Sequence, residues 1–248
     1  MTNSAFPSPD ASLETTAQLA RWAIERAKQL GADEACAEVS VDKGLSVATH
    51  RGDIESVEHS DETVLTVTVW KGKRRGRAST SDLSERAMEA VLKSAAEIAA
   101  VSAEDPATGL PDERDLQTEF RELDLWHPWT GTVEDAAALL SRMESAAEAY
   151  DSRITNSDGA HFATSEGAFT LANTLGFCAG YRYGRHSMDL GSIAEDARGM
   201  QRGDAWTEER KFACLKSPEA LGRLAAERAV ARLGARPLSN RTCFEFRH

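Results

Sequence analysis

The sequence LSVATHRGDIESVEH, residues 45–59, places two runs of apolar and β-branched residues on either side of Gly52 and Asp53. Glycine and aspartate favour tight turns, and β-branched residues favour strands. The stretch therefore predicts two antiparallel strands joined by a turn. The same turn accounts for the Arg51-Gly52-Asp53 triplet without a role in cell adhesion.

Strand signals continue on both sides of this hairpin. Residues 35–41 alternate apolar and polar side chains, which is typical of a half-buried strand. Residues 63–80 predict a further hairpin with Gly72 in its turn. The first third of the chain is therefore expected to form an antiparallel sheet.

Helices are predicted before and after these strands, over residues 13–30 and 81–100, because apolar side chains recur there at helical spacing. Ser12 is placed to cap the first helix. Asp82 and Glu85 have the spacing of a capping box at the second helix. The order in this part of the chain is helix, strands, helix.

The second half repeats that order. Thr132 and Asp135 are placed to cap a third helix, and Ser217 caps a fourth helix that ends at Gly234. The strands between these helices are expected to be short, with breaks at residues 157–159, 165–167 and 174–176. The sequence therefore predicts an α+β fold built from two units, each of helix, antiparallel strands and helix.

The stretch GFCAGYRYGRHSMD, residues 176–189, mixes tyrosines with basic residues. Its alternation predicts a strand in which Tyr181 and Tyr183 pack on the helices. Arg182 and Arg185 are then expected on the other face or at a turn near Gly184. Basic residues among aromatics can also bind nucleic acid, but the net charge of −11 disfavours that role.

Basic residues are densest in KGKRRGR, residues 71–77. They suggest a binding site for phosphate or for an acidic peptide. The favoured interpretation is a solvated hairpin whose charges protect an edge strand from aggregation. The candidate interaction surface from sequence is Lys73, Arg74, Arg75, Arg182 and Arg185.

Histidines and carboxylates gather in sequence around the first turn, and such groups can bind zinc. Neighbouring strand residues point to opposite faces, so these side chains are not expected to converge on one metal ion. Solvated positions are the preferred interpretation of His50, Asp53, Glu55 and His59. His161 and His186 are expected to be structural. Ser165 and Ser187 lack the Gly-x-Ser-x-Gly setting of a serine hydrolase. We therefore expect no catalytic residue, no metal ligand and no cofactor site in this chain.

The four cysteines, Cys36, Cys178, Cys214 and Cys243, lie far apart and form no Cys-x-x-Cys pair. The first residues lack the basic and apolar regions of a secretory signal, and no apolar run is long enough to span a membrane. The expectation is a cytoplasmic protein with reduced thiols and no membrane association.

Several stretches, taken in order, resemble the TldD/PmbA family, long labelled modulators of DNA gyrase. Residues 44–84 are similar to the N-terminal region of that family. The stretches LDLWHPW, RITNSDGA, GFCAGYRYGRHSMDLGSIAE and GMQR, which begin at residues 123, 153, 176 and 199, resemble its PmbA (TldE) branch in particular.

The resemblance implies a cytosolic protease complex of TldD-type and PmbA-type subunits that cleaves small or unfolded peptides, such as antitoxins and precursors of modified peptides. Zinc is implied on a His-Glu-x-x-x-His helix, with a later cysteine, of the TldD-type subunit alone. The PmbA-type subunit is then the metal-free, non-catalytic partner. A homodimer, and a stand-alone peptide- or nucleic-acid-binding module without a protease role, are the alternatives.

The resemblance also implies a division of the chain. Residues 1–128 are expected to form the N-terminal domain and residues 129–237 the central domain. Family members continue into a large β-rich C-terminal domain, whereas this sequence ends in LSNRTCFEFRH. Residues 238–248 are therefore interpreted as the start of that missing domain, in a truncated chain.

Overall fold

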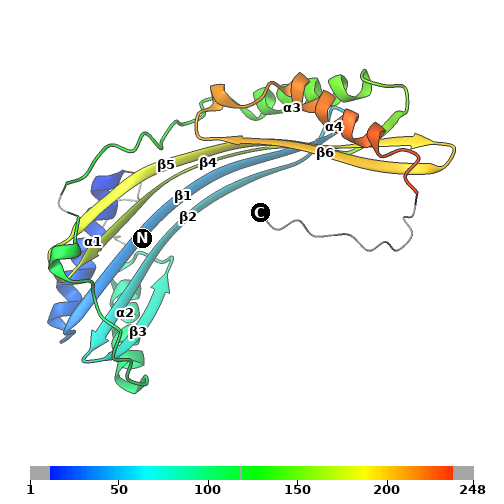
Figure 1. Cartoon of the computed structure of the whole chain (residues 1–248). Helices are drawn as coiled ribbons and strands as arrows, with labels where there is room; N and C mark the ends of the chain where they lie inside the picture. Colours follow the sequence, from blue (N-terminus) through cyan, green and yellow to red (C-terminus); the bar gives the residue numbers. More distant parts are fainter. Residues whose placement is uncertain (1–11, 118, 237–248) are drawn as a thin grey trace.

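A computed structural model describes residues 12–117 and 119–236 of the chain, so the predicted third segment, 238–248, lies outside the described residues. Within these ranges one six-stranded antiparallel sheet carries four α-helices (Figure 1). The helices are α1 (Leu13–Gln29), α2 (Glu85–Val101), α3 (Val133–Glu148) and α4 (Pro218–Ala231). The strands are β1 (Glu34–His50), β2 (Asp53–Lys71), β3 (Arg74–Thr80), β4 (Ile154–Asn173), β5 (Cys178–Asp196) and β6 (Gly199–Glu209).

The strand order β3-β2-β1-β4-β5-β6 is symmetric about the β1–β4 pair. Each half of the chain contributes a helix, three strands and a helix, so the predicted α+β fold and its repeated order are confirmed. Both halves build the same sheet, because β1 and β4 pair along most of their lengths. The division near residue 128 stays a prediction.

The strands are longer than the sequence signals indicated. The Gly52 turn is confirmed, but the strands around it run for 17 and 19 residues. Residues 165–167 and Gly184 lie inside β4 and β5, so the turns predicted there are wrong. Residues 157–159 make a break in the pairing register, while residues 174–176 do form a turn. Glycine in a strand interior marks close packing here, not a turn.

All four helices pack on one face of the sheet. Val39 packs with α1 and α2, whereas Val47 packs with α3 and α4. These two valines lie an even number of residues apart in β1, so they share a face. Ala172 and Phe162 of β4 repeat this arrangement at the two ends. The opposite face is concave and carries no helix in the described ranges (Figure 1).

Local helix signals are mostly confirmed. Ser12 and Ser217 cap α1 and α4, and Thr132 forms a capping box with Asp135 at α3. The capping box predicted at α2 is wrong, because Ser84 is the N-cap and its hydroxyl accepts from the Ala87 amide. None of the helices described is long and apolar enough to cross a membrane.

The β1–β2 turn is tied to α3 by Glu144, whose carboxylate is buried. It accepts hydrogen bonds from the backbone amides of Arg51 and Gly52, at 2.9 Å each. The hydroxyls of Thr49 and Ser157 lie 3.1 and 3.2 Å from the same carboxylate. Arg51 and Gly52 have φ angles of 54° and 83°, so the backbone turns sharply there and presents both amides to Glu144.

Candidate functional site

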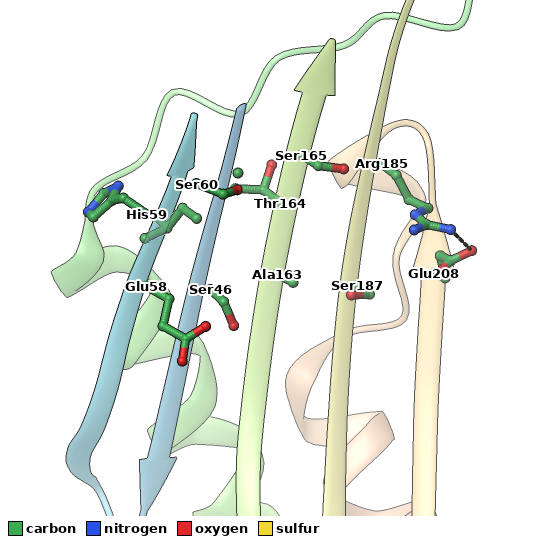
Figure 2. Close-up of a pocket in the computed structure, with 12 residues that line it drawn as sticks. Ser46, Glu58, His59, Ser60, Ala163, Thr164, Ser165, Arg185, Ser187 and Glu208 are labelled. Atoms are coloured by element: carbon green, nitrogen blue, oxygen red, sulfur yellow. Dashed lines mark hydrogen bonds and ion pairs between the residues drawn. The ribbon is translucent and has the colours of Figure 1, made fainter. Parts of the chain in front are cut away.

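The concave face is organised in rows of side chains that run across paired strands. One row is Glu58, Ser46, Ala163, Ser187 and Glu208, and the next is Ser60, Gly44, Ser165 and Arg185. Directly opposed residues in an antiparallel sheet share a face, so these two rows lie side by side. They line a polar pocket of about 320 Å³ (Figure 2).

The polar pocket owes its depth to Gly44. A Cβ at this position would lie 2.6 Å from the Ser60 hydroxyl and would fill the floor. On one side Arg185 forms a loose ion pair with Glu208, at 3.5 Å. On the other side Glu58 is exposed and has no ion pair among the described residues. The serine hydroxyls of the pocket therefore lie between the carboxylate of Glu58 and the guanidinium of Arg185, which Glu208 holds only loosely.

Along the sheet the next row is Asp42, Gly167 and Tyr183. The Tyr183 phenol lies over Gly167, where a Cβ would be 2.7 Å from the ring, and it donates a hydrogen bond to Asp42. Burial raises the pKa of the Tyr183 phenol, and the bond to the Asp42 carboxylate raises it further. The pair is therefore held as a neutral phenol on a carboxylate.

Beyond this row the face becomes aromatic. Phe169 and Tyr181 are cross-strand partners with ring centroids 5.8 Å apart, and Tyr181 lies 6.0 Å from Tyr183. Phe120 and Leu123, from the segment that connects α2 to α3, lie against this row and line a cavity of about 470 Å³. We name this cavity the aromatic groove; its other lining residues are Gln117, Glu119, Arg121, Leu171, Phe177, Ala179 and Gly180.

Residues 37–99 match the PmbA/TldA metallopeptidase domain 1, and residues 126–233 match the PmbA/TldA metallopeptidase central domain. The two matches together cover more than half of the chain. The chain belongs to the PmbA/TldD family.

Curated family members point to the PmbA branch. Metalloprotease PmbA of Escherichia coli O157:H7 is 38% identical over 205 residues, which are 82% of this chain and 46% of that protein. A PmbA homologue of Haemophilus influenzae is 34% identical over 226 residues, 90% of this chain and 49% of the homologue. The chain thus spans about half the length of these PmbA relatives.

Solved structures of family members share the fold. A modulator of DNA gyrase from Bacteroides thetaiotaomicron superposes with a TM-score of 0.81 at 19% identity, over 89% of this chain and 51% of that one. TldE from Thermococcus kodakarensis superposes with a TM-score of 0.71 at 15% identity, over 86% of this chain and 47% of that one. The range that matches domain 1, residues 37–99, contains β2, β3 and most of β1, and the range that matches the central domain, residues 126–233, contains β4 to β6.

The tyrosine stretch, which resembles the PmbA branch, faces the opposite way from the prediction. Tyr181 and Tyr183 lie on the concave face, and Arg182 lies on the helix side. There the Arg182 guanidinium stacks on Trp126 at 3.1 Å, and the Trp126 indole donates to Glu166 at 2.9 Å. Alternation predicts that neighbours face opposite ways, but it does not say which face the helices cover.

This placement lowers the loss of folding stability expected from truncating Tyr181. The side chain is 42% exposed, so Tyr181→Ala should lower the free energy of unfolding by about 1 kcal/mol, well below the cost of losing a buried aromatic. Urea denaturation followed by circular dichroism measures this. A loss above about 3 kcal/mol would show that the ring is packed as a core residue.

The five basic residues predicted as an interaction surface are not brought together. Lys73 lies in the turn between β2 and β3, and Arg74 is the first residue of β3; their side chains donate to the carbonyls of Thr108 and Ser102 and so hold the connecting segment. Arg75 is exposed on the same strand. Of the remaining two, Arg182 is on the helix side, whereas Arg185 lies in the polar pocket.

The histidines form no metal site in the described part of the chain, where no group of three or more potential ligands is placed to hold a metal ion. His50 contacts the Ser157 carbonyl at 3.2 Å and lies 3.8 Å from Glu55. His186 is buried between the Thr164 hydroxyl and the His127 carbonyl, at 2.8 and 2.9 Å. The structural interpretation of His186 is confirmed.

The polar pocket and the aromatic groove were not predicted. Ser165 and Ser187 do lie in the pocket, but neither hydroxyl is hydrogen-bonded to a histidine among the described residues. The missing information was the pairing register, which places Ser46 of β1 beside residues of β4 more than a hundred positions later. No local motif encodes that proximity.

Proposed function

We propose that this chain is the PmbA-type, non-catalytic part of a peptidase complex and that its concave face guides substrate peptides to a zinc-bearing TldD-type subunit. The family match supports the peptidase context. The observation that carries the guiding role is the concave face, on which the described residues place no helix and on which a polar pocket continues into an aromatic groove.

An unfolded peptide presents backbone amides and alternating side chains, and the concave face carries groups that can bind both. The hydroxyls of Ser46, Ser60 and Ser187 make no side-chain hydrogen bond within the described residues, so they are free to meet backbone groups. The aromatic groove offers contact area for an apolar side chain. No zinc chemistry is assigned to this chain, since its described residues do not supply a ligand set.

A nucleic-acid role, the other interpretation, fits this face less well. Glu58, Glu208 and Asp42 line the polar rows, and carboxylates repel phosphate. The whole chain has a formal net charge of −11, so binding would release few counterions. The charge of the face therefore favours peptide over nucleic acid.

Association with a TldD-type subunit tests the proposal. The two proteins, purified separately and mixed, should elute together from a size-exclusion column, and the mixture should cleave fluorescein-labelled denatured casein faster than the TldD-type subunit alone. Serum albumin in place of this chain is the control. Separate elution together with unchanged cleavage would contradict the proposed function.

A further inference from the structure

One edge of β5 is left open in the described structure. β6 pairs with β5 from His186 onward, so residues 178–185 have no strand partner on their outer side. The Gly184 amide points outward, because it donates to the Leu125 carbonyl at 2.9 Å. Outward groups recur at every second residue, so the amides and carbonyls of Arg182 and Gly180 also point outward. Among the described residues they have no backbone partner there.

The aromatic groove lies along this open edge. The connecting segment runs in the same direction as β5, with Phe120 packed edge-on against Phe177 at 5.8 Å and Leu125 bonded to Gly184. Between these two contacts no backbone hydrogen bond joins the segment to β5 among the described residues. Phe120 is 61% exposed and Leu123 is 55% exposed, although both line the cavity. The result is a slot with a strand edge on one side and apolar side chains on the other.

Charge is asymmetric in this slot. Arg121 lines the aromatic groove, and Arg185 and Arg210 line the adjoining cavity of about 710 Å³. Arg121 and Arg210 have no ion pair in the described ranges. The carboxylates that line the two cavities are Glu119 and Asp42, and Asp42 is engaged by Tyr183. An acidic group of the occupant is therefore favoured at the Arg185 end.

We propose that the aromatic groove binds an extended peptide that pairs antiparallel with the open edge of β5. An apolar side chain of the peptide lies opposite Tyr181, and an acidic side chain lies two residues along, opposite Tyr183 and within reach of Arg185 and Arg210. The backbone groups of Gly180 and Arg182 supply affinity, and the side chains supply selectivity. This inference rests on the proposed function, because it names the class of peptide that the concave face would guide.

Edge pairing makes a prediction about individual peptide amides. The probe is a fluorescein-labelled peptide, Ser-Glu-Ser-Phe-Ser-Glu-Ser-amide, whose symmetry supplies an acid on either side of the phenylalanine. The serines beside phenylalanine would lie opposite Gly180 and Arg182, so their amides point at β5. N-methylation of those two serines should weaken binding at least about tenfold, whereas N-methylation of phenylalanine should change it less than about twofold. Equal affinities of the two methylated peptides would overturn the pairing.

Protein variants test the side-chain contacts by fluorescence anisotropy with the same probe. Phe120→Ser, and the double change Arg185→Gln with Arg210→Gln, should each weaken binding about tenfold. The matched controls are Trp206→Ser, an exposed aromatic on the concave face of β6, and Arg75→Gln on β3. Both controls should stay within about twofold of the unchanged chain. Equal losses in variants and controls would overturn the site.

The two proposals fail separately. If the chain binds the probe as predicted but does not associate with a TldD-type subunit, the groove proposal stands and the proposed function is contradicted. If the chain associates with a TldD-type subunit and speeds casein cleavage but does not bind the probe, the proposed function stands and the groove proposal is contradicted.

Discussion

Glu144→Ala is expected to lower the free energy of unfolding by about 3–5 kcal/mol, because it removes a buried carboxylate that accepts four hydrogen bonds and leaves the buried Thr49 hydroxyl without that acceptor. The lost bonds are those to the amides of Arg51 and Gly52 and to the hydroxyls of Thr49 and Ser157. The β1–β2 turn would then lose its attachment to α3. The expected consequence is a loss of cooperativity between the turn and the second half of the sheet.

Urea denaturation followed by circular dichroism measures this loss. Glu148→Ala is the matched control, because Glu148 is an exposed carboxylate on the same helix, and it should cost less than about 0.5 kcal/mol. Glu144→Gln keeps one carbonyl oxygen and should lie between the two. Equal stability of Glu144→Ala and Glu148→Ala would show that the turn holds itself.

Phe162→Ala should cost a similar amount, about 3–5 kcal/mol, through a cavity under α3 and α4. The ring is fully buried and lies 4.7 Å from Trp129 and 6.3 Å from Phe212, measured between ring centroids. Trp129 comes from the connecting segment, so the cavity would also loosen that segment over the sheet.

Phe169 supplies a matched control for this prediction. It lies on the same strand but on the concave face, where it is half-buried, so Phe169→Ala should cost no more than about 2 kcal/mol. Thermal unfolding of the two variants compares them directly. If both cost the same, the assignment of the two faces of β4 would be wrong.

Sequence reasoning succeeded where a signal is local. The turn at Gly52, the caps at Ser12 and Ser217 and the capping box at Thr132 each depend on a few neighbouring residues. The repeated order of helix, strands and helix followed from these signals.

Prediction from the sequence was wrong where a feature depends on residues far apart in the chain. The sequence predicts turns at Gly167 and Gly184, yet each lies inside a strand where a neighbour approaches closely. Glu144 has no sequence signal of its own, because Thr49, Arg51 and Gly52, three of its four partners, lie more than ninety residues earlier in the chain. The face that carries Tyr181 was wrong for the same reason, since helix coverage is decided by packing. The residues that share the concave face are set by the pairing register of the strands, which no local sequence pattern encodes.

Amide hydrogen exchange of the chain, with and without the Ser-Glu-Ser-Phe-Ser-Glu-Ser-amide peptide, tests most directly whether this face binds an extended chain. Saturating peptide should slow exchange of the outward amides of Gly180 and Arg182 and leave the β6 amides unchanged. Unchanged exchange at Gly180 and Arg182 under saturating peptide would contradict the binding of peptide at this edge.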